Sequence, residues 1–327
     1  MNIVISDAAW FVDEPNWETQ LGTLLIELLQ HPSHSVDADA GLMLKWCEGR
    51  IPLYAEELRA LLLRSNPRAN ACEVTVQPDG SALLAGPPPW CLTASAALPL
   101  IRQPLRLFLE NDDADWSFLC SVVASIAALK TRTALEVMHG GGSELLRKIA
   151  DAGADDMKKW RSFFMFDSDR LHPSELHAGW SAPSGDGCEG YQFQEACKNA
   201  NIPTTRWHML RRRSIENYLP QRVLEQENPD CTSVLFSMNI GEMLYFYNMK
   251  GGLEGDGIWP PNHKKHVRSS RSQSRWDALS SDEKNSLRAG FGRSIADKFK
   301  SLPKNQSWDA EILDEGLNIA SALLDAI

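Results

Sequence analysis

The sequence predicts an α/β protein whose main sheet is largely parallel. Between residues 105 and 166, short apolar segments alternate with helical stretches, the pattern typical of parallel sheets flanked by helices. Acidic residues follow the first and third of these segments, and glycines follow the second. Because ligands bind beyond the carboxyl ends of parallel strands, this part of the chain is also the expected functional site.

Residues 1–100 are predicted to form a separate accessory domain of mixed α+β type. Leucines recur at helical spacing within residues 17–29 and again within residues 53–63, so both segments are expected to be helices. No catalytic set of residues is evident in this domain. A docking or specificity role is therefore the expectation for it.

A β-hairpin is predicted near the end of this first domain. The short apolar segments 73–76 and 82–84 flank Pro78-Asp79-Gly80, which has turn-forming composition. The following Gly-Pro-Pro-Pro run at 86–89 cannot continue a helix or a strand, and it is interpreted as a linker to the next domain.

Residues 101–250 are predicted to form the catalytic domain. Ser143 is a suitable N-cap for its second helix, and Gly153 is a suitable stop. The expected elements are strands at 105–109, 134–138 and 162–166, and helices at 116–129, 144–152 and 234–249.

Residues 251–327 are predicted to be a basic loop followed by helices that pack on the catalytic domain. Histidine, lysine and arginine are frequent between residues 251 and 275, together with glycine and proline. Two helices are expected to begin near Ser281 and Ser307. The basic residues of the loop are His263, Lys264, Lys265, His266, Arg268, Arg271 and Arg275.

Composition limits the classes of function. The net charge of −10 means that nucleic acid would have to be bound through local basic patches or metal rather than bulk attraction. No uninterrupted apolar run is long enough to span a membrane, and the N-terminus lacks the basic region of a signal peptide. The seven scattered cysteines contain no Cys-x-x-Cys pair, which favours reduced thiols and a cytoplasmic location.

Two groups of carboxylates are candidate metal ligands. Glu110 ends the first strand and is followed closely by Asp113 and Asp115, while Asp167 and Asp169 follow the third strand. Residues i and i+2 of an extended segment point to the same side, so the aspartate pair is expected to reach one ion. Mg²⁺ and Mn²⁺ prefer such oxygen ligands. Taken singly, each group is also consistent with a solvated acidic turn.

A phosphate-binding role is predicted for two further segments. Gly140 and Gly141 end the second strand and precede a helix, where backbone N–H groups favour an anion. Arg212 and Arg213 stand just before Glu216, and arginine suits bidentate contact with phosphate. We expect these five residues to contact a polyanionic substrate, although a tight turn and a solvated charged face are the simpler alternatives.

The order of these motifs resembles the topoisomerase–primase (TOPRIM) domain. The resemblance covers about residues 103–220 and is closest to the branch found in overcoming-lysogenization-defect (OLD) nucleases of bacterial defence. It rests on Leu-Glu-Asn-Asp-Asp-Ala-Asp at 109–115, Phe-Asp-Ser-Asp-Arg at 166–170 and Arg-Arg-Ser-Ile-Glu-Asn-Tyr-Leu at 212–219. Asn111 stands where the family usually has glycine, and no Walker motif is present.

The resemblance implies phosphodiester cleavage that depends on Mg²⁺ or Mn²⁺. Glu110 would be a metal ligand or general base, Asp167 and Asp169 would bind the metal, and Asp115 or Asp113 would complete a second metal site. Lys250, or one of the two arginines, would stabilise the charge of the transition state.

The leading hypothesis is therefore an endonuclease acting on DNA or RNA as an effector of a bacterial antiviral system. Any ATPase or sensor function would come from a separate partner protein, and the oligomeric state is left open. The alternatives are a catalytically silent TOPRIM-like module that binds nucleic acid or a partner, and primase-like nucleotidyl transfer.

Overall fold

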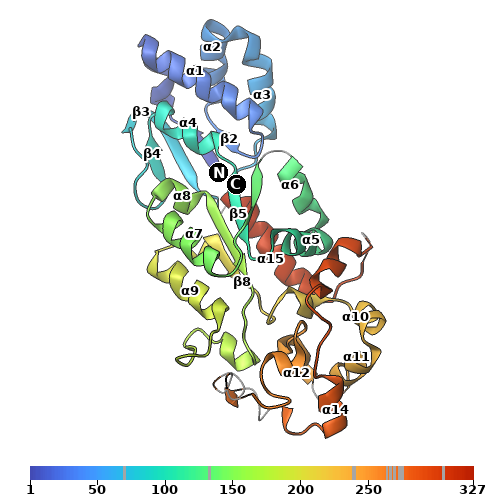
Figure 1. Cartoon of the computed structure of the whole chain (residues 1–327). Coiled ribbons are helices and arrows are strands. Elements are labelled where there is room, and N and C mark those ends of the chain that lie inside the picture. The colour runs from blue at the N-terminus through green and yellow to red at the C-terminus, as the bar shows by residue number, and fades with distance from the viewer. Residues whose placement is uncertain are drawn as a thin grey trace.

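The protein is an α/β molecule with two four-stranded sheets, each parallel throughout and flanked by helices (Figure 1). The first sheet has the strand order β2-β1-β3-β4 and the second has the order β6-β5-β7-β8. The computed structural model describes residues 1–68, 71–131, 134–237, 241–262, 264, 267, 270–271, 276–303 and 306–327.

The N-terminal sheet and its helices enclose one apolar core whose buried residues lie between Met1 and Ile101, with Met157 and Trp160 packed against it. The expected helices at 17–29 and 53–63 correspond to α1 and α3. The elements are β1 (Asn2–Ile5), α1 (Pro15–Gln30), β2 (Ser35–Asp37), α2 (Ala40–Arg50), α3 (Ala55–Arg64), β3 (Glu73–Ser81), β4 (Trp90–Leu92) and α4 (Ala94–Arg102).

The predicted hairpin is wrong, and with it the α+β description of this part of the chain. β3 continues through Pro78-Asp79-Gly80 and pairs in parallel with β4, which follows the Gly-Pro-Pro-Pro loop. The pairing register shifts between Val76 and Ser81, so the turn-forming residues bulge the strand without reversing it. Gly80 is required there because a Cβ atom would lie 2.3 Å from the carbonyl carbon of Leu92.

The second sheet confirms the expected strand–helix alternation. The strand predicted at 162–166 has the same bounds as β7. The first helix begins at Asp112, earlier than expected, because Asn111 is its N-cap. The elements are β5 (Leu105–Leu109), α5 (Asp112–Val122), α6 (Ala127–Thr131), β6 (Leu135–His139), α7 (Ser143–Gly153), α8 (Asp156–Trp160), β7 (Ser162–Phe166), α9 (Glu189–Asn199) and β8 (Trp207–Met209).

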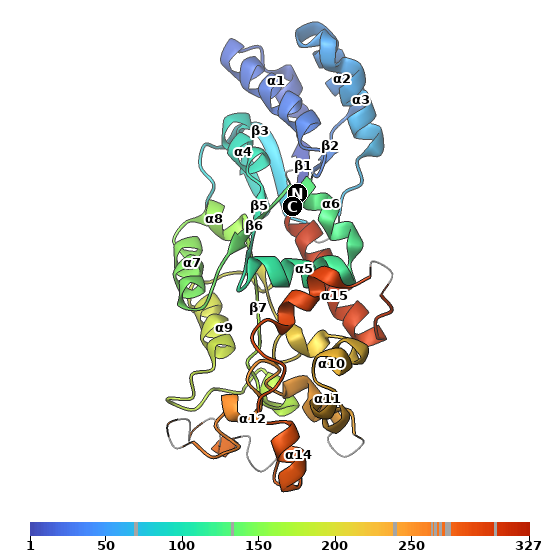
Figure 2. The ribbon, with the colours of Figure 1, turned by 45° about the vertical axis from the view of Figure 1, so that its right-hand side comes forward.

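Alternate residues of the central strands serve two different cores. Leu107 and Phe163 belong to the core shared with α5 and the C-terminal helices, whereas Phe108 and Phe164 belong to the core beneath α7 and α9. The rings of Phe108 and Phe164 stack with their centroids 5.0 Å apart. Figure 2 shows α7 and α9 on one side of the sheet and α5 and α15 on the other. The strands read as continuous apolar runs because both faces of the sheet are buried.

The C-terminal part packs on the α5 side of the sheet. The expected helix at 234–249 is wrong, because α11 ends at Leu235 and residues 241–246 form a 3₁₀ turn that starts with Gly241 at φ +44°. The two closing helices are present as α14 and α15. The elements are α10 (Gln221–Glu227), α11 (Pro229–Leu235), α12 (Gly252–Gly255), α14 (Ser281–Ser286) and α15 (Ala310–Ala326).

Helix α15 lies close against α5. A Cβ atom on Gly316 would lie 2.4 Å from Cγ1 of Val122, so glycine permits this approach. The indole N–H of Trp308 donates a hydrogen bond to the carbonyl of Ser121 at 2.9 Å. Of the expected basic loop, His263, Lys265, His266, Arg268 and Arg275 lie outside the described residues.

None of the helices that the structure describes combines the length and apolar character needed to cross a lipid bilayer.

The substitution Leu107→Ala is expected to lower the free energy of unfolding by about 2–5 kcal/mol, because it leaves a cavity between the sheet and α5. Leu107 is fully buried, whereas Leu63 on α3 is 83% exposed. Leu63→Ala is the matched control and should change stability by less than about 0.5 kcal/mol. Urea denaturation measures both, and equal losses for the two variants would contradict this assignment of the core.

Candidate active site

The candidate site lies where the chain reverses its direction of travel across the second sheet. From β5 the chain moves outward to β6, and it then returns to place β7 on the other side of β5. Loops that leave β5 and β7 therefore diverge, and such switch points form ligand-binding crevices in parallel sheets. Glu110 follows β5 and Asp167 follows β7. The backbone N–H of Asp167 donates to Oε1 of Glu110 at 3.3 Å.

Asp115 rather than Asp113 joins this pair. The side chain of Asp115 is 4% exposed, and its Oδ2 atom accepts a hydrogen bond from the backbone N–H of Asn111 at 3.0 Å. Asn111 in turn caps α5 by accepting from the backbone N–H of Ala114. Asp113 has an exposed side chain and lies 3.6 Å from Nζ of Lys300. The structure therefore places Asp115 with the other buried acids and leaves Asp113 at the surface.

Glu216 and Lys250 form an ion pair at the same place. Glu216 lies in the 3₁₀ turn Ile215–Tyr218, which is fixed by a capping box between Ser214 and Asn217. Its side chain is 1% exposed, and Nζ of Lys250 lies 2.9 Å from its Oε1 atom. Apart from this ion pair, neither carboxylate oxygen of Glu216 has a hydrogen-bond partner among the described residues. Lys250 thus places a positive charge beside this buried carboxylate.

Asp169 reaches the site in a different conformation from the one expected. Its φ of +54° is left-handed, so the Asp167–Asp169 segment is not extended. The backbone N–H of Asp169 donates to the carbonyl of Arg213 at 2.9 Å, and its Oδ2 atom lies 3.4 Å from the backbone N of Gly190. Asp167 accepts from the backbone N–H of Ile215 at 3.2 Å. Both aspartates nevertheless line one cavity.

The crowded negative charge perturbs the acids of this site. Burial raises the pKa of Glu110 well above its ordinary value, and the neighbouring Asp167 and Asp169 add to the effect. Burial also raises the pKa of Asp167, with a further contribution from Glu216. For Asp115, burial outweighs its backbone hydrogen bond and raises the pKa to about 7.

The pKa of Lys250 is shifted in the direction that favours its charged form. Burial lowers its pKa, but the charges of Glu216 and Asp167 outweigh burial and raise the pKa above the ordinary lysine value. Lys250 is therefore held in its cationic form by the carboxylates around it.

A cavity of about 520 Å³ opens onto Asp167, Asp169 and Lys250, whereas Glu110, Asp115 and Glu216 lie behind its wall. Its wall combines acids, cationic side chains and glycines of the 185–187 loop. Arg271 contacts this loop, because its guanidinium binds Glu175 at 2.6 Å and Asp186 at 2.7 Å. Besides these glycines, the lining includes Asp167, Asp169, Asp186, Glu189, Lys250 and Lys264.

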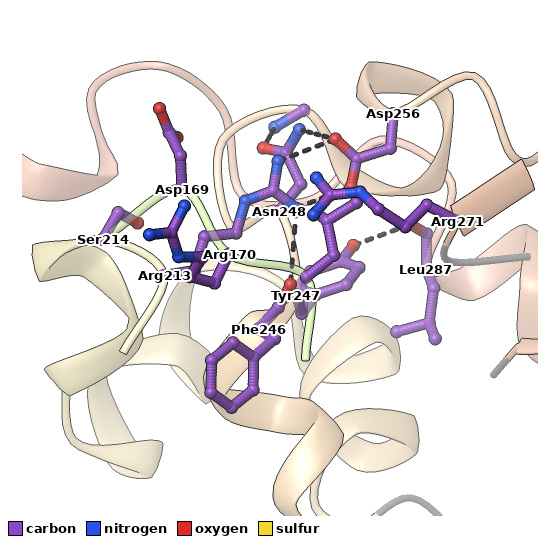
Figure 3. A network of polar contacts seen from close by, with 12 residues as sticks. Asp169, Arg170, Arg213, Ser214, Phe246, Tyr247, Asn248, Asp256, Arg271 and Leu287 are labelled. Carbon is purple, nitrogen blue, oxygen red and sulfur yellow. Dashed lines mark hydrogen bonds and ion pairs between the residues drawn. The ribbon is translucent and has the colours of Figure 1, made fainter. Parts of the chain in front are cut away.

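The two predicted phosphate-binding arginines are held inside the protein. Arg213 makes a buried bidentate pair with Asp256, with distances of 2.6 and 2.7 Å, and Asn248 donates to the same carboxylate (Figure 3). The guanidinium of Arg212 lies 3.9 Å from the ring centre of Tyr245 and 4.9 Å from that of Tyr218. These contacts fix both arginines in the fold, and Arg213 also lines the cavity.

The backbone N–H groups of the glycine turn also form hydrogen bonds within the protein. The backbone N–H groups of Gly140 and Gly141 donate to the carbonyls of Leu109 and Glu110, at 2.6 and 3.1 Å. A Cβ atom on Gly140 would lie 2.8 Å from the oxygen of Leu109, so glycine permits the turn to press against the end of β5. The turn thereby fixes the backbone of Glu110, and these two N–H groups are not directed at a ligand.

Sequence reasoning missed Glu315 of α15. This buried carboxylate accepts from the backbone N–H of Arg211 at 2.8 Å and from the hydroxyl of Tyr218 at 2.6 Å, and it lies 2.9 Å from Nε2 of His208. It therefore secures the segment that presents Glu216. It lies about a hundred positions from its partners, and no local sequence pattern marks it.

The donor chemistry of the site suits a hard divalent cation. The acids supply oxygen atoms only, and burial together with their mutual repulsion raises the pKa values of Glu110, Asp115 and Asp167. Apart from its ion pair with Lys250, Glu216 has buried oxygens with no hydrogen-bond partner among the described residues. Within the described part of the chain, however, no three His, Cys, Asp or Glu side chains stand together as a preformed metal site. Binding would therefore require the acids to draw together and Lys250 to shift.

Comparisons with known proteins found no match: no family model, no curated protein and no solved structure is similar to this chain.

The substitution Asp115→Asn is expected to make the free energy of unfolding less dependent on pH between pH 4 and pH 7. The folded protein keeps a proton on Asp115 up to a pKa of about 7, while the unfolded chain releases it near 3.8. The folded state thus binds more protons between these values, so wild-type stability falls as the pH rises from 4 to 7. With EDTA present, the variant should be more stable than wild type at pH 8 by about 2–4 kcal/mol.

Urea denaturation at pH 4.5 and pH 8 measures this difference. Asp113→Asn is the matched control, because that side chain is 79% exposed, and it should leave the pH dependence unchanged. A variant Asp115→Asn with the wild-type pH dependence would show that Asp115 is ionised at neutral pH.

Proposed function

We propose that this protein is a nuclease of the TOPRIM-like type that depends on Mg²⁺ or Mn²⁺ and hydrolyses phosphodiesters of DNA or RNA. The observation that supports the proposal is the convergence of Glu110, Asp115, Asp167, Glu216 and Lys250 at one switch point, from segments up to 140 positions apart. A solvated acidic turn needs no such convergence. The crowding of acids around one lysine is costly unless a further cation is bound beside them.

Glu110, Asp115, Asp167 and Asp169 are the residues that would hold the metal ion. When bound, the metal would activate water and neutralise charge on the attacked phosphate. Burial and the neighbouring acids raise the pKa of Glu110, so its carboxylate accepts a proton more readily than that of an exposed glutamate. Lys250 is held cationic, and it can bind a non-bridging phosphate oxygen and stabilise developing charge. Lys264 is a further cationic contact on the cavity wall.

A role as effector of a bacterial antiviral system follows from the sequence resemblance to OLD-type nucleases. The chain has no Walker motif, so we propose that a separate ATPase or sensor protein controls the activity. A cytoplasmic location fits both the substrate and the seven cysteines, none of which forms a disulfide in the structure.

A catalytically silent binding module is the second candidate. It is favoured by the 2.9 Å ion pair between Lys250 and Glu216, and by the absence of a preformed metal triad among the described residues. Calorimetry with Mn²⁺ separates the two candidates, because a nuclease of this type must bind the ion and a silent module need not.

Glu110→Gln and Asp167→Asn are each expected to lower the cleavage rate at least about 100-fold, because each removes a charged oxygen from the proposed metal set. The assay uses plasmid DNA, linear DNA and total RNA with Mg²⁺ or Mn²⁺, and EDTA should abolish cleavage. Asp113→Asn is the matched control, with unchanged activity. Equal cleavage by wild type and both site variants would refute the proposal, and co-purification with a partner tests for a required second protein.

Lys250→Met is expected to uncouple metal binding from catalysis. Removing the cation leaves Glu216 buried and unpaired, so Mn²⁺ should bind at least as tightly as in wild type, while cleavage falls about 100-fold. Lys300→Met is the control, because Lys300 pairs only with the exposed Asp113 and Asp297 among the described residues. A parallel loss of Mn²⁺ affinity would assign Lys250 a structural role.

A further inference from the structure

A second cavity of about 660 Å³ lies between the two sheets. Its walls come from the start of β3, from α8, from the 3₁₀ turn Thr204–Arg206, and from one face of α15. Arg206 directly precedes β8, and α8 lies just before β7. Because these strands are parallel, the cavity is at the end of the sheet opposite the acidic site.

Two buried guanidinium groups at this junction have no acidic side chain within ion-pair distance among the described residues. Arg206 is 2% exposed and Arg161 is 3% exposed. Arg206 donates to Sγ of Cys72 at 2.7 Å, and its Nε atom has no hydrogen-bond partner among the described residues. Arg161 donates to the backbone oxygens of Gln103, Ala326 and Ile327. No described acidic side chain lies within ion-pair distance of either, and a buried charge without a counter-ion is unfavourable.

The two arginines also repel each other. Burial lowers the pKa of Arg161 to about 9, and the charge of Arg206 contributes to the decrease. Of the two, Arg206 lines the cavity, so an anion bound there could pair with its free Nε–H and relieve this repulsion.

The remaining wall limits the kind of anion. Glu73 is exposed and Asp325 is half-buried, and both line the cavity, so a multiply charged anion without donors would be repelled. The ligand therefore needs an anionic group for Arg206 and hydrogen-bond donors for the two acids. One phosphate and several hydroxyl groups provide both, because carboxylates accept well from ribose hydroxyls. Trp160 and the Pro88-Pro89 segment supply apolar surface for a planar ring. The volume is also within the usual range for small-molecule sites.

We propose that this cavity binds a ribonucleoside monophosphate. Its phosphate pairs with Arg206, its ribose donates to Asp325 or Glu73, and its base lies against Trp160. The ligand would bridge β3 of the first sheet, the turn before β8, and α15. Since β7 and β8 lead directly to Asp167 and to the 211–216 segment, its binding would stabilise the strands that position the acidic site.

Isothermal titration calorimetry in EDTA tests this site with AMP, GMP, CMP and UMP, with adenosine and inorganic phosphate as separate arms. At least one nucleotide should bind wild type 10-fold or more tightly than either adenosine or phosphate alone. Arg206→Gln should weaken that binding at least 10-fold. Arg59→Gln is the matched control, because Arg59 is an exposed arginine on α3. This variant should bind the nucleotide with the affinity of wild type.

A second variant covers the outcome in which Arg206→Gln fails to fold. Ala322→Trp fills the cavity from α15 without replacing a charged group, and it should weaken nucleotide binding at least 10-fold in protein that still unfolds cooperatively. The proposal is overturned by folded wild type that binds none of the four nucleotides, by phosphate binding as tightly as every nucleotide, or by wild-type affinity in both variants. Glu110→Gln should keep full nucleotide affinity, so this result is independent of the nuclease proposal.

Discussion

The burial of several carboxylates around one lysine is the constraint on which the rest of the structure depends. The carboxylates of four residues repel one another here: Glu110, Asp115, Asp167 and Glu216. Side-chain rotamer preferences alone would not keep them together. The protein fixes them through backbone hydrogen bonds and caps: Asn111 N–H to Asp115, Ile215 N–H to Asp167, and the capping box around Glu216. Lys250 offsets part of the charge. A site kept at this energetic cost is more often functional than structural.

The C-terminal part of the chain makes this arrangement rigid. Arg213 carries the backbone carbonyl that binds Asp169, and the buried pair with Asp256 fixes Arg213 (Figure 3). Glu315 of α15 secures the segment from His208 to Tyr218. Helix α15 therefore contacts the support of the acidic site and, through Asn318 and Asp325, lines the second cavity. One helix thus contributes to both ends of the second sheet.

Local patterns predicted the second sheet better than the first. The apolar runs of β5 and β7 are long enough, and sufficiently bounded by turn residues, to define strands without knowledge of their partners. In the first sheet, Pro78-Asp79-Gly80 has the composition of a hairpin turn, but β3 pairs with β4 across a loop. Turn composition cannot distinguish a reversal from a bulge, because both need the same backbone flexibility.

The sequence by itself determined that acidic residues end two apolar strands, since strand and acid are neighbours along the chain. Only the tertiary structure decided which acids meet. It chose Asp115 over Asp113 through helix phase, placed Glu216 against Lys250, and turned Arg212 and Arg213 inward. It also buried Arg161 and Arg206 at the opposite end of the sheet, where no described acidic side chain lies within ion-pair distance of either. These outcomes depend on contacts between residues far apart in the chain, which periodicity and composition do not specify.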